Sequence, residues 1–98
     1  MKQLTHQAFD RWRKERVKFV LIDVREKEEH ESYNVGGYLV PLSNLKTGYG
    51  LLNTSLPVVV YCKRGIRSQI AIQRLRQQFP TTSFYNLKKG ILHLNKTS

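Results

Sequence analysis

Three apolar runs divide the chain and are separated by stretches in which polar residues dominate. The runs at residues 19–22 and 57–61 are unbroken, whereas the run at 83–87 also contains Ser83 and Asn86, and β-branched or aromatic side chains are frequent in each. A short, unbroken apolar run is typical of a strand that is buried on both faces, as in a parallel sheet. A further short strand is expected over residues 38–40, where Pro41 stops it.

Two stretches between these runs have the spacing of amphipathic helices. The first is expected over about residues 5–17, with a threonine cap at its start, and it buries Phe9 and Trp12 because residues three apart share a helix face. The second is expected over about residues 67–79, since Pro80 enforces its end. Its inward-facing residues are Ala71, Ile72, Leu75 and Phe79.

The remaining segments give weaker signals. Residues 26–34 are polar and are expected to form a short helical turn, and Gly36-Gly37 marks a turn. The other signals, in chain order, are a brief helix at 43–45, a loop with Gly48 and Gly50, a terminal helix that starts at 90–92, and frayed residues at 95–98.

This alternation of strands and helices favours a small α/β fold, with a mainly parallel central sheet flanked by helices on both faces. A chain of 98 residues has room for one core, so residues 1–98 are expected to form a single domain. Ligands in such sheets bind outside the carboxyl ends of the strands. Cys62 directly follows the run at 57–61 and is therefore expected at such an end.

Composition indicates the cellular compartment and excludes some types of site. The one cysteine excludes an intramolecular disulfide framework and leaves too few soft ligands for a structural zinc site, so no metal or other cofactor is expected. No apolar run approaches about 18 residues, and the N-terminus lacks the pattern of a signal peptide. These features favour a cytoplasmic protein without membrane contact.

Charge is distributed unevenly along the chain. Residues 1–31 hold all seven acidic residues and eight Lys or Arg, whereas residues 32–98 hold nine Lys or Arg and no acid. Such a basic surface attracts small oxyanions, an acidic protein or nucleic acid, and it is equally compatible with a surface that has no special partner. The chain has no aromatic–basic array of the kind found on RNA-binding sheets, so nucleic acid is the least favoured partner.

The segment 62–68 combines a thiol, three cations and a glycine at the start of the second helix. A curled loop between a strand and a helix allows backbone N–H groups and the helix N-terminus to converge on the sulfur. Its cations, Lys63, Arg64 and Arg67, add formal positive charge, so the thiolate of Cys62 is favoured and is expected to be well populated at neutral pH. Gly65 permits a tight backbone, and Ser68 can cap the helix or donate to the thiolate.

The alternative interpretation of Cys62 is an inert core residue, but a core thiol gains nothing from three cationic neighbours. The histidines do not suggest a Cys–His pair, because no spacing fixes one of them beside Cys62, and they are interpreted as surface or packing residues. This disfavours a papain-like hydrolase. The three are His6, His30 and His93.

Four segments in order resemble the rhodanese-like domain family, and the resemblance extends over nearly the whole chain. Residues 21–26 are similar to the Asp-Val-Arg segment of the family and residues 35–42 to its Gly-x-x-x-x-Pro-Leu stretch. Residues 59–68 are similar to its active-site loop and residues 85–91 to its closing Leu-x-Gly-Gly-Ile motif.

The resemblance implies a sulfurtransferase in which Cys62 takes sulfane sulfur as a persulfide, from thiosulfate or a protein persulfide, and passes it to a thiophilic acceptor. In the family pattern the backbone N–H groups of residues 63–67 hold the anionic sulfur and Arg67 steers the substrate. Asp23 and Arg25 would brace the loop region, a role that we interpret as structural. The implied substrate-binding residues are Lys63, Arg64, Gly65, Ile66, Arg67 and Ser68.

The sequence departs from the family pattern at three places. Asn34 stands where histidine is common in a stretch that is one residue shorter, and the resulting Gly-Gly variant is similar to rhodanese domains that are attached to, or work with, E1-like enzymes that activate sulfur-carrier proteins. Lys89 replaces the first glycine of the closing motif. Leu94 stands where tryptophan is common, which puts the docking of a last helix in question.

Other functions remain open at this stage. The ring from Cys62 through Arg67 has six residues, whereas the phosphatase branch of this fold has a seven-residue loop that admits the larger phosphate, so the length favours sulfur. The main alternative is a rhodanese-like module without turnover that binds an anion or a partner, such as a sulfur-carrier or E1-like protein.

Overall fold

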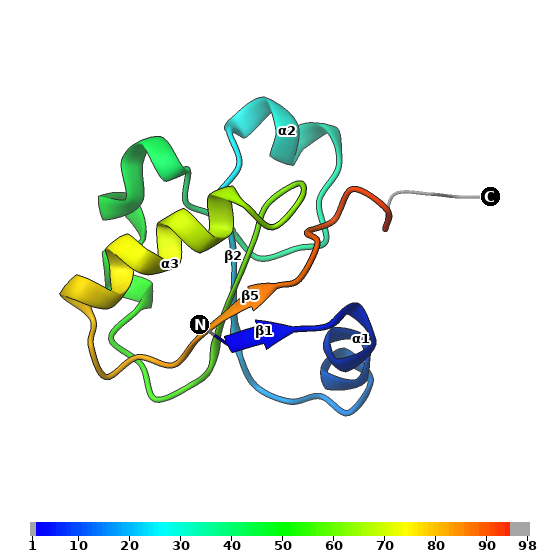
Figure 1. Cartoon of the computed structure of the whole chain (residues 1–98), viewed down its shortest axis with the longest axis horizontal. Coiled ribbons are helices and arrows are strands. Elements are labelled where there is room, and N and C mark those ends of the chain that lie inside the picture. Colours follow the sequence, from blue (N-terminus) through cyan, green and yellow to red (C-terminus); the bar gives the residue numbers. More distant parts are fainter. Residues whose placement is uncertain (1, 95–98) are drawn as a thin grey trace.

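The computed structural model describes residues 2–94, and the protein has three layers with a parallel sheet in the middle (Figure 1). Its five strands in this range are β1 (Lys2–Leu4), β2 (Val20–Asp23), β3 (Tyr38–Leu39), β4 (Val58–Tyr61) and β5 (Phe84–Leu87). Their order in the sheet is β1-β5-β4-β2-β3, and each neighbouring pair is parallel. The expected α/β fold is confirmed.

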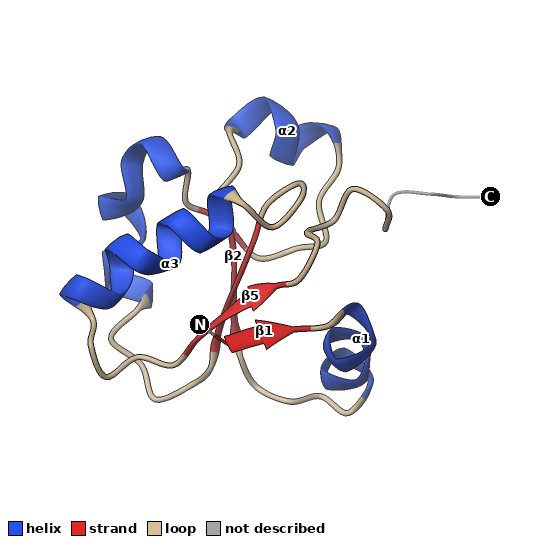
Figure 2. Ribbon diagram, in the orientation of Figure 1, coloured by secondary structure: helices blue, strands red, loops and turns tan. Residues whose placement is uncertain are grey.

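Helices cover both faces of the sheet, as Figure 2 shows. Helix α1 (His6–Lys14) packs on one face, and α3 (Arg67–Gln78) packs on the other together with the 3-10 segment η1 (Leu42–Leu51). Helix α2 (Lys27–Ser32) follows β2 at the carboxyl end of the sheet. The segments that follow β2, β4 and β5 therefore meet at the carboxyl end of the sheet.

The central strand β4 joins the two layers of the core. All four of its residues are fully buried, and they alternate between the faces because successive side chains of a strand point to opposite sides. Val58, Val60 and then Cys62 pack in the core under α3, whereas Val59 and Tyr61 pack in the core under α1. Burial on both faces explains why the sequence of this segment is an unbroken apolar run.

Strand β1 was not predicted from the sequence. Only Leu4 of its three residues is buried, and the strand lies at the edge of the sheet, where it pairs with β5. A three-residue edge strand with one apolar residue carries no periodic signal. Its formation depends on the exposed edge of β5, which is a tertiary feature.

Helix α1 ends earlier than predicted. It stops at Lys14 instead of extending to residue 17, because Arg16 adopts a left-handed conformation with a φ of 57° and the amide of Val17 turns back to the carbonyl of Trp12. The packing of Phe9 and Trp12 against the sheet agrees with the prediction. Helix boundaries of this kind are fixed by the local turn and not by the apolar spacing.

One loop prediction and one helix prediction were wrong, and a third prediction lies outside the described range. The region with Gly48 and Gly50 is part of the 3-10 segment η1, where Gly48 is needed because a Cβ would collide with the side chain of Val40. Residues 90–92 form turns and no helix. The prediction of fraying at 95–98 concerns residues outside those that the structure describes.

The closing turn after β5 supports the segment that follows β4. The amides of Ile91 and Leu92 donate to the carbonyls of Cys62 and Lys63, at 3.1 and 2.9 Å. Gly90 has a φ of 63°, and a Cβ there would collide with these same two carbonyl groups. The closing turn thus fixes the backbone at Cys62 through contacts that only glycine permits.

The closing turn provides two substitutions with opposite expected effects. Gly90→Ala should lower the free energy of unfolding by about 1–3 kcal/mol, because it places a Cβ in a left-handed and crowded position. Lys89 also adopts a left-handed φ, of 67°, so Lys89→Gly should raise the free energy of unfolding by up to about 1 kcal/mol. Urea titrations followed by circular dichroism measure both, and equal effects of the same sign would contradict this account.

Candidate active site

The sulfur of Cys62 lies at the carboxyl end of β4 and accepts hydrogen bonds from the loop that follows. The donors are the backbone amides of Gly65, at 3.1 Å, and Ser68, at 3.3 Å. Cys62 is 1% exposed, so these contacts form away from bulk water. Two amides directed at one sulfur from a curled loop are the arrangement that favours an anion at this atom.

The loop keeps its curled shape through Gly65 and two side chains. Gly65 has a φ of 87°, which is a conformation that favours glycine. Its carbonyl accepts hydrogen bonds from Gln69 Nε2 at 2.7 Å and from Asn86 Nδ2 at 3.4 Å. The loop is therefore held from α3 on one side and from β5 on the other.

A pocket of about 370 Å³ opens in front of the loop. Cys62 and four of the six residues that were predicted to bind substrate line it, namely Lys63, Arg64, Ile66 and Arg67. Lys63 and Arg64 are exposed, and Ile66 is 64% exposed. Within residues 2–94 no hydrogen bond engages the amides of Arg64, Ile66 and Arg67, so these donors are available to a bound anion.

Arg67 does not extend freely into this pocket. Its guanidinium forms a bidentate pair with the carboxylate of Glu29 on α2, at 2.8 and 2.9 Å. The hydrogen bond from Arg67 lowers the pKa of Glu29 from 4.5 to about 2, and the same bond raises the pKa of Arg67. Because the carboxylate stays ionised, it offsets much of the positive charge that Arg67 brings to the pocket.

Asp23 and Arg25 form a buried pair at the end of β2. The Asp23 carboxylate accepts from the backbone amide of Arg25 at 2.9 Å, from its guanidinium at 2.9 Å, and pairs with His30 Nδ1 at 2.8 Å. Arg25 also donates to the carbonyl of Tyr33. These bonds hold α2 and the residue after it, and the Arg25 guanidinium also lies over the ring of Tyr61, 5.7 Å from its centroid, directly before Cys62.

Ser68 and Asn86 continue the hydrogen bonding behind the sulfur. The hydroxyl of Ser68 lies 3.3 Å from Cys62 Sγ and donates a short hydrogen bond to Asn86 Oδ1. Ser68 and Asn86 are 0% and 1% exposed. The predicted site therefore has a second layer that consists of two neutral, buried polar side chains.

Glu29 and Asn86 belong to the site but were not predicted from the sequence. Glu29 was one of several acids in a polar stretch, and nothing in that stretch indicated which one meets Arg67. Asn86 left a weak signal, because it is the only amide in an otherwise apolar and aromatic run and shares a strand face with Phe84. A polar residue on a core-facing position requires a buried partner, and this requirement could have marked Asn86.

Two of the three histidines in residues 2–94 have partners other than the sulfur. His30 pairs with Asp23, His6 Nε2 lies 2.6 Å from the carbonyl oxygen of Gly90, and His93 is exposed. In the described part of the chain none of them forms a hydrogen bond with Cys62. A Cys–His pair is therefore absent from the resting site of residues 2–94.

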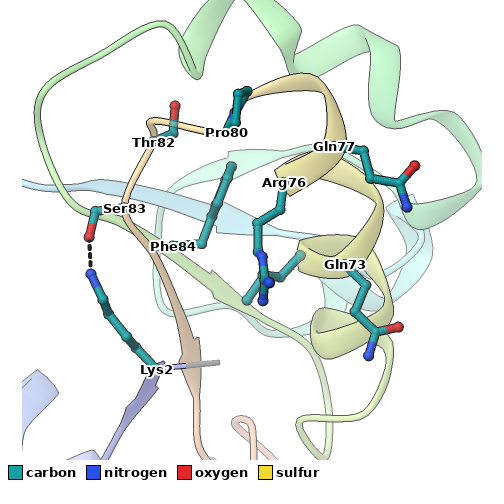
Figure 3. Close-up of a pocket in the computed structure, with 9 residues that line it drawn as sticks. Lys2, Gln73, Arg76, Gln77, Pro80, Thr82, Ser83 and Phe84 are labelled. Carbon is teal, nitrogen blue, oxygen red and sulfur yellow. Dashed lines mark hydrogen bonds between the residues drawn. The ribbon is translucent and has the colours of Figure 1, made fainter.

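A wider hollow of about 920 Å³ lies at the opposite end of the sheet (Figure 3). It lies between the end of α3 and the start of β5, and Lys2 bonds to Ser83 across its edge at 2.6 Å. The residues that line it include no cysteine, histidine or carboxylate. Nucleophilic chemistry is therefore better supported at the smaller pocket beside Cys62.

Two further features of the described residues bear on the function. No group of three or more His, Cys, Asp or Glu side chains within residues 2–94 is arranged to bind a metal ion. In the same range no helix has the length and apolar character needed to cross a membrane.

Comparison with known proteins identifies the family. The model of the rhodanese-like domain matches residues 5–96, and the chain belongs to this family. The protein YqhL of Bacillus subtilis is 42% identical over 91 residues, which cover 92% of this chain and 69% of YqhL. The adenylyltransferase and sulfurtransferase MOCS3 of Drosophila grimshawi is 35% identical over 80 residues, which cover 74% of this chain but only 18% of MOCS3.

The fold agrees with this assignment. The crystal structure of a rhodanese-like domain protein from Staphylococcus aureus superimposes with a TM-score of 0.82 and 22% identity, over 93% of this chain and 88% of that one. The rhodanese-like fold is thus common to both. The family includes sulfurtransferases, and the single cysteine of this chain occupies the loop described above.

The Arg67–Glu29 pair predicts an acid-sensitive contribution to stability. The pKa of Glu29 in the folded protein, about 2, lies below its ordinary value of 4.5, so the carboxylate stabilises the fold above about pH 4.5 and loses this contribution as the pH falls toward 2. Glu29→Gln should therefore be less stable than the parent protein above pH 4.5, and the difference should shrink in acid. Urea titrations over this pH range test it, and a difference that does not depend on pH would contradict it.

Proposed function

We propose that this rhodanese-like domain is a sulfurtransferase that moves sulfane sulfur through a persulfide on Cys62. The observation that carries the proposal is the position of Cys62 Sγ, which accepts two backbone hydrogen bonds at the base of a pocket with cationic walls. These bonds favour a thiolate, which is the nucleophilic form of cysteine.

In the first step the Cys62 thiolate attacks the outer sulfur of the donor. With thiosulfate, a bond forms between Sγ and the outer sulfur, the S–S bond of thiosulfate breaks, and sulfite leaves with the electron pair. Cys62 then carries a persulfide whose negative charge lies on the outer sulfur. A protein persulfide reacts in the same way, with its own thiolate as the leaving group.

In the second step a thiophilic acceptor attacks the outer sulfur. With cyanide, thiocyanate forms and the Cys62 thiolate is released, so the protein is neither oxidised nor reduced over the cycle. A thiol acceptor becomes a persulfide by the same displacement. No metal or other cofactor takes part in either step.

The pocket residues have separate proposed roles. The amides of Arg64, Ile66 and Arg67 hold the outer sulfur, because they are donors with no acceptor among the described residues. Lys63 and Arg64 attract the anionic donor, since their side chains are exposed at the rim. Arg67 contributes less than its formal charge suggests because of its pair with Glu29. Gly65 and Ser68 shape the loop, and Asp23 and Arg25 position α2.

The partners of this activity are a small anionic sulfur donor or a protein that carries a persulfide, and a sulfur-carrier protein is a further candidate acceptor. The chain matches one part of MOCS3, whose name joins an adenylyltransferase with a sulfurtransferase. This supports a place in a relay of sulfur between proteins. The site requires a reduced thiol, which fits the cytoplasm.

One observation favours a second function, in which the domain binds an anion or a protein partner without turnover. The guanidinium of Arg67 is already occupied by Glu29, so the pocket of the resting protein offers less charge for a small substrate than the sequence suggests. In this case the basic rim would dock a sulfur-carrier or E1-like protein.

Mass spectrometry of the intact protein separates the two functions. After treatment with thiosulfate and removal of excess reagent, we expect a mass increase of about 32 Da, the mass of one sulfur atom, that cyanide removes. Cys62→Ser should show no increase, because serine keeps the size of the side chain but cannot form a persulfide. A folded protein that binds sulfite yet never gains this mass would support the binding module instead.

A further inference from the structure

The buried side chains behind Cys62 fix the direction of one hydroxyl proton. Asn86 Nδ2 donates to Gln3 Oε1 at 2.8 Å and to the carbonyl of Gly65 at 3.4 Å. The backbone carbonyl of Gly65 can only accept, so it requires the amide nitrogen of Asn86 on that side, and the side chain of Gln3 presents its oxygen to the same nitrogen. Its Oδ1 therefore faces Ser68.

The Ser68 hydroxyl has one proton and two neighbours that can accept it. Asn86 Oδ1 carries no proton and can only accept from Ser68 Oγ, so the hydroxyl proton is directed at Asn86. Cys62 Sγ lies 3.3 Å from the same oxygen. With the proton directed away, Ser68 presents a lone pair to the sulfur, and only a protonated thiol can complete this contact as a donor.

We propose that Asn86 is a positioning residue that holds the proton of the Ser68 hydroxyl away from Cys62 and thereby stabilises the thiol against the thiolate. The two backbone amides at Cys62 Sγ favour the anion, and the Ser68 oxygen opposes them. The balance sets the pH at which the sulfur becomes a nucleophile. The role of this balance in sulfur transfer rests on the proposed function, whereas the ionisation of Cys62 can be measured without it.

The contacts from Asn86 through Ser68 to Cys62 involve no charged side chain of residues 2–94. Ser68 and Asn86 are neutral and buried, and no charged side chain in the described part of the chain donates to or accepts from either of them. The charged or titratable groups of the segments around the site are Lys63 and Arg64 on the loop, Arg67 on α3, Glu29 on α2, Asp23 and Arg25 at the end of β2, Lys88 and Lys89 on the closing turn, and His6 on α1, whose ring bonds to the Gly90 carbonyl. All of them are retained in the variants used below.

The pH dependence of alkylation by iodoacetamide measures ionisation of Cys62 directly, because it is the only thiol in the chain. In Ser68→Ala the thiol loses its acceptor, so the midpoint of the alkylation profile should move to lower pH. In Asn86→Leu the Ser68 proton is free to turn toward the sulfur, and the midpoint should also fall, by about one pH unit, which is about tenfold in the ratio of thiolate to thiol.

The sign of the Ser68→Ala effect decides the proposal. If Ser68 instead donates to the thiolate, this variant raises the midpoint, and the proposal is overturned. Adding Asn86→Leu to Ser68→Ala should produce no further shift, because Asn86 acts through the hydroxyl. Should Asn86→Leu fail to fold, as judged by circular dichroism, Ser68→Ala still overturns the proposal if its midpoint rises and supports the acceptor role of the Ser68 oxygen if its midpoint falls.

Gln69→Ala is the matched control, because Gln69 bonds to the Gly65 carbonyl as Asn86 does but does not touch Ser68. Because a looser loop weakens the amide contacts that favour the thiolate, we expect its midpoint to stay at that of the parent protein or to rise, in contrast to the fall in Asn86→Leu. An equal shift in Gln69→Ala and Asn86→Leu would assign the effect to the loop and overturn the proposal. Absence of a persulfide after thiosulfate treatment would remove the proposed function and leave these midpoints, and the inference, intact.

Discussion

The double burial of β4 is the constraint on which the site depends. Because both faces of this strand are covered, its direction is fixed by packing on each side, and Cys62 leaves the sheet at one defined point. The loop must then turn back at once so that α3 can cover the face with Val58 and Val60. That return brings the amides of Gly65 and Ser68 onto the sulfur. The same geometry that completes the core thus places two backbone amides at the sulfur.

The site is supported from three directions, each by a different type of contact. The closing turn holds the backbone of Cys62 and Lys63 by main-chain hydrogen bonds. Helix α2 holds Arg67 through an ion pair, and β5 holds the loop through the amide of Asn86. The support by α2 has an electrostatic consequence that the other two lack, because Glu29 places a carboxylate next to the cationic pocket. The pocket therefore has exposed cations at its rim, Lys63 and Arg64, whereas the charge of Arg67 at the first turn of α3 is partly offset by Glu29.

Membership of the rhodanese-like family and the geometry of the loop support the same chemistry from independent directions. The family match rests on the order of residues along the chain, whereas the sulfur environment rests on atomic contacts. The relatives show the domain both as most of a protein, in YqhL, and as a small part of one, in MOCS3. A site that is complete within one small domain is consistent with use in both settings.

The sequence by itself determined the features that depend on neighbouring residues. The apolar runs predicted three of the strands, Pro80 predicted the end of α3, and the segment 62–68 predicted a thiol at the mouth of a helix with glycine at the tight point. Strand β1 and the early end of α1 escaped prediction, because the first depends on the edge of β5 and the second on a left-handed turn at Arg16. Local pattern carries no information about either.

Only the tertiary structure decided which polar side chains meet the site. Glu29 is 38 positions from Arg67, and Asn86 is 18 positions from Ser68, so no spacing along the chain relates them. They come together because parallel strands place their carboxyl ends at one edge of the sheet, where the segments that follow β2 and β4 converge with the end of β5. The seven consecutive residues 62–68 thus contain the thiol, the cations and the glycine, whereas the packing of the whole domain supplies Glu29 and Asn86 as the partners of Arg67 and Ser68.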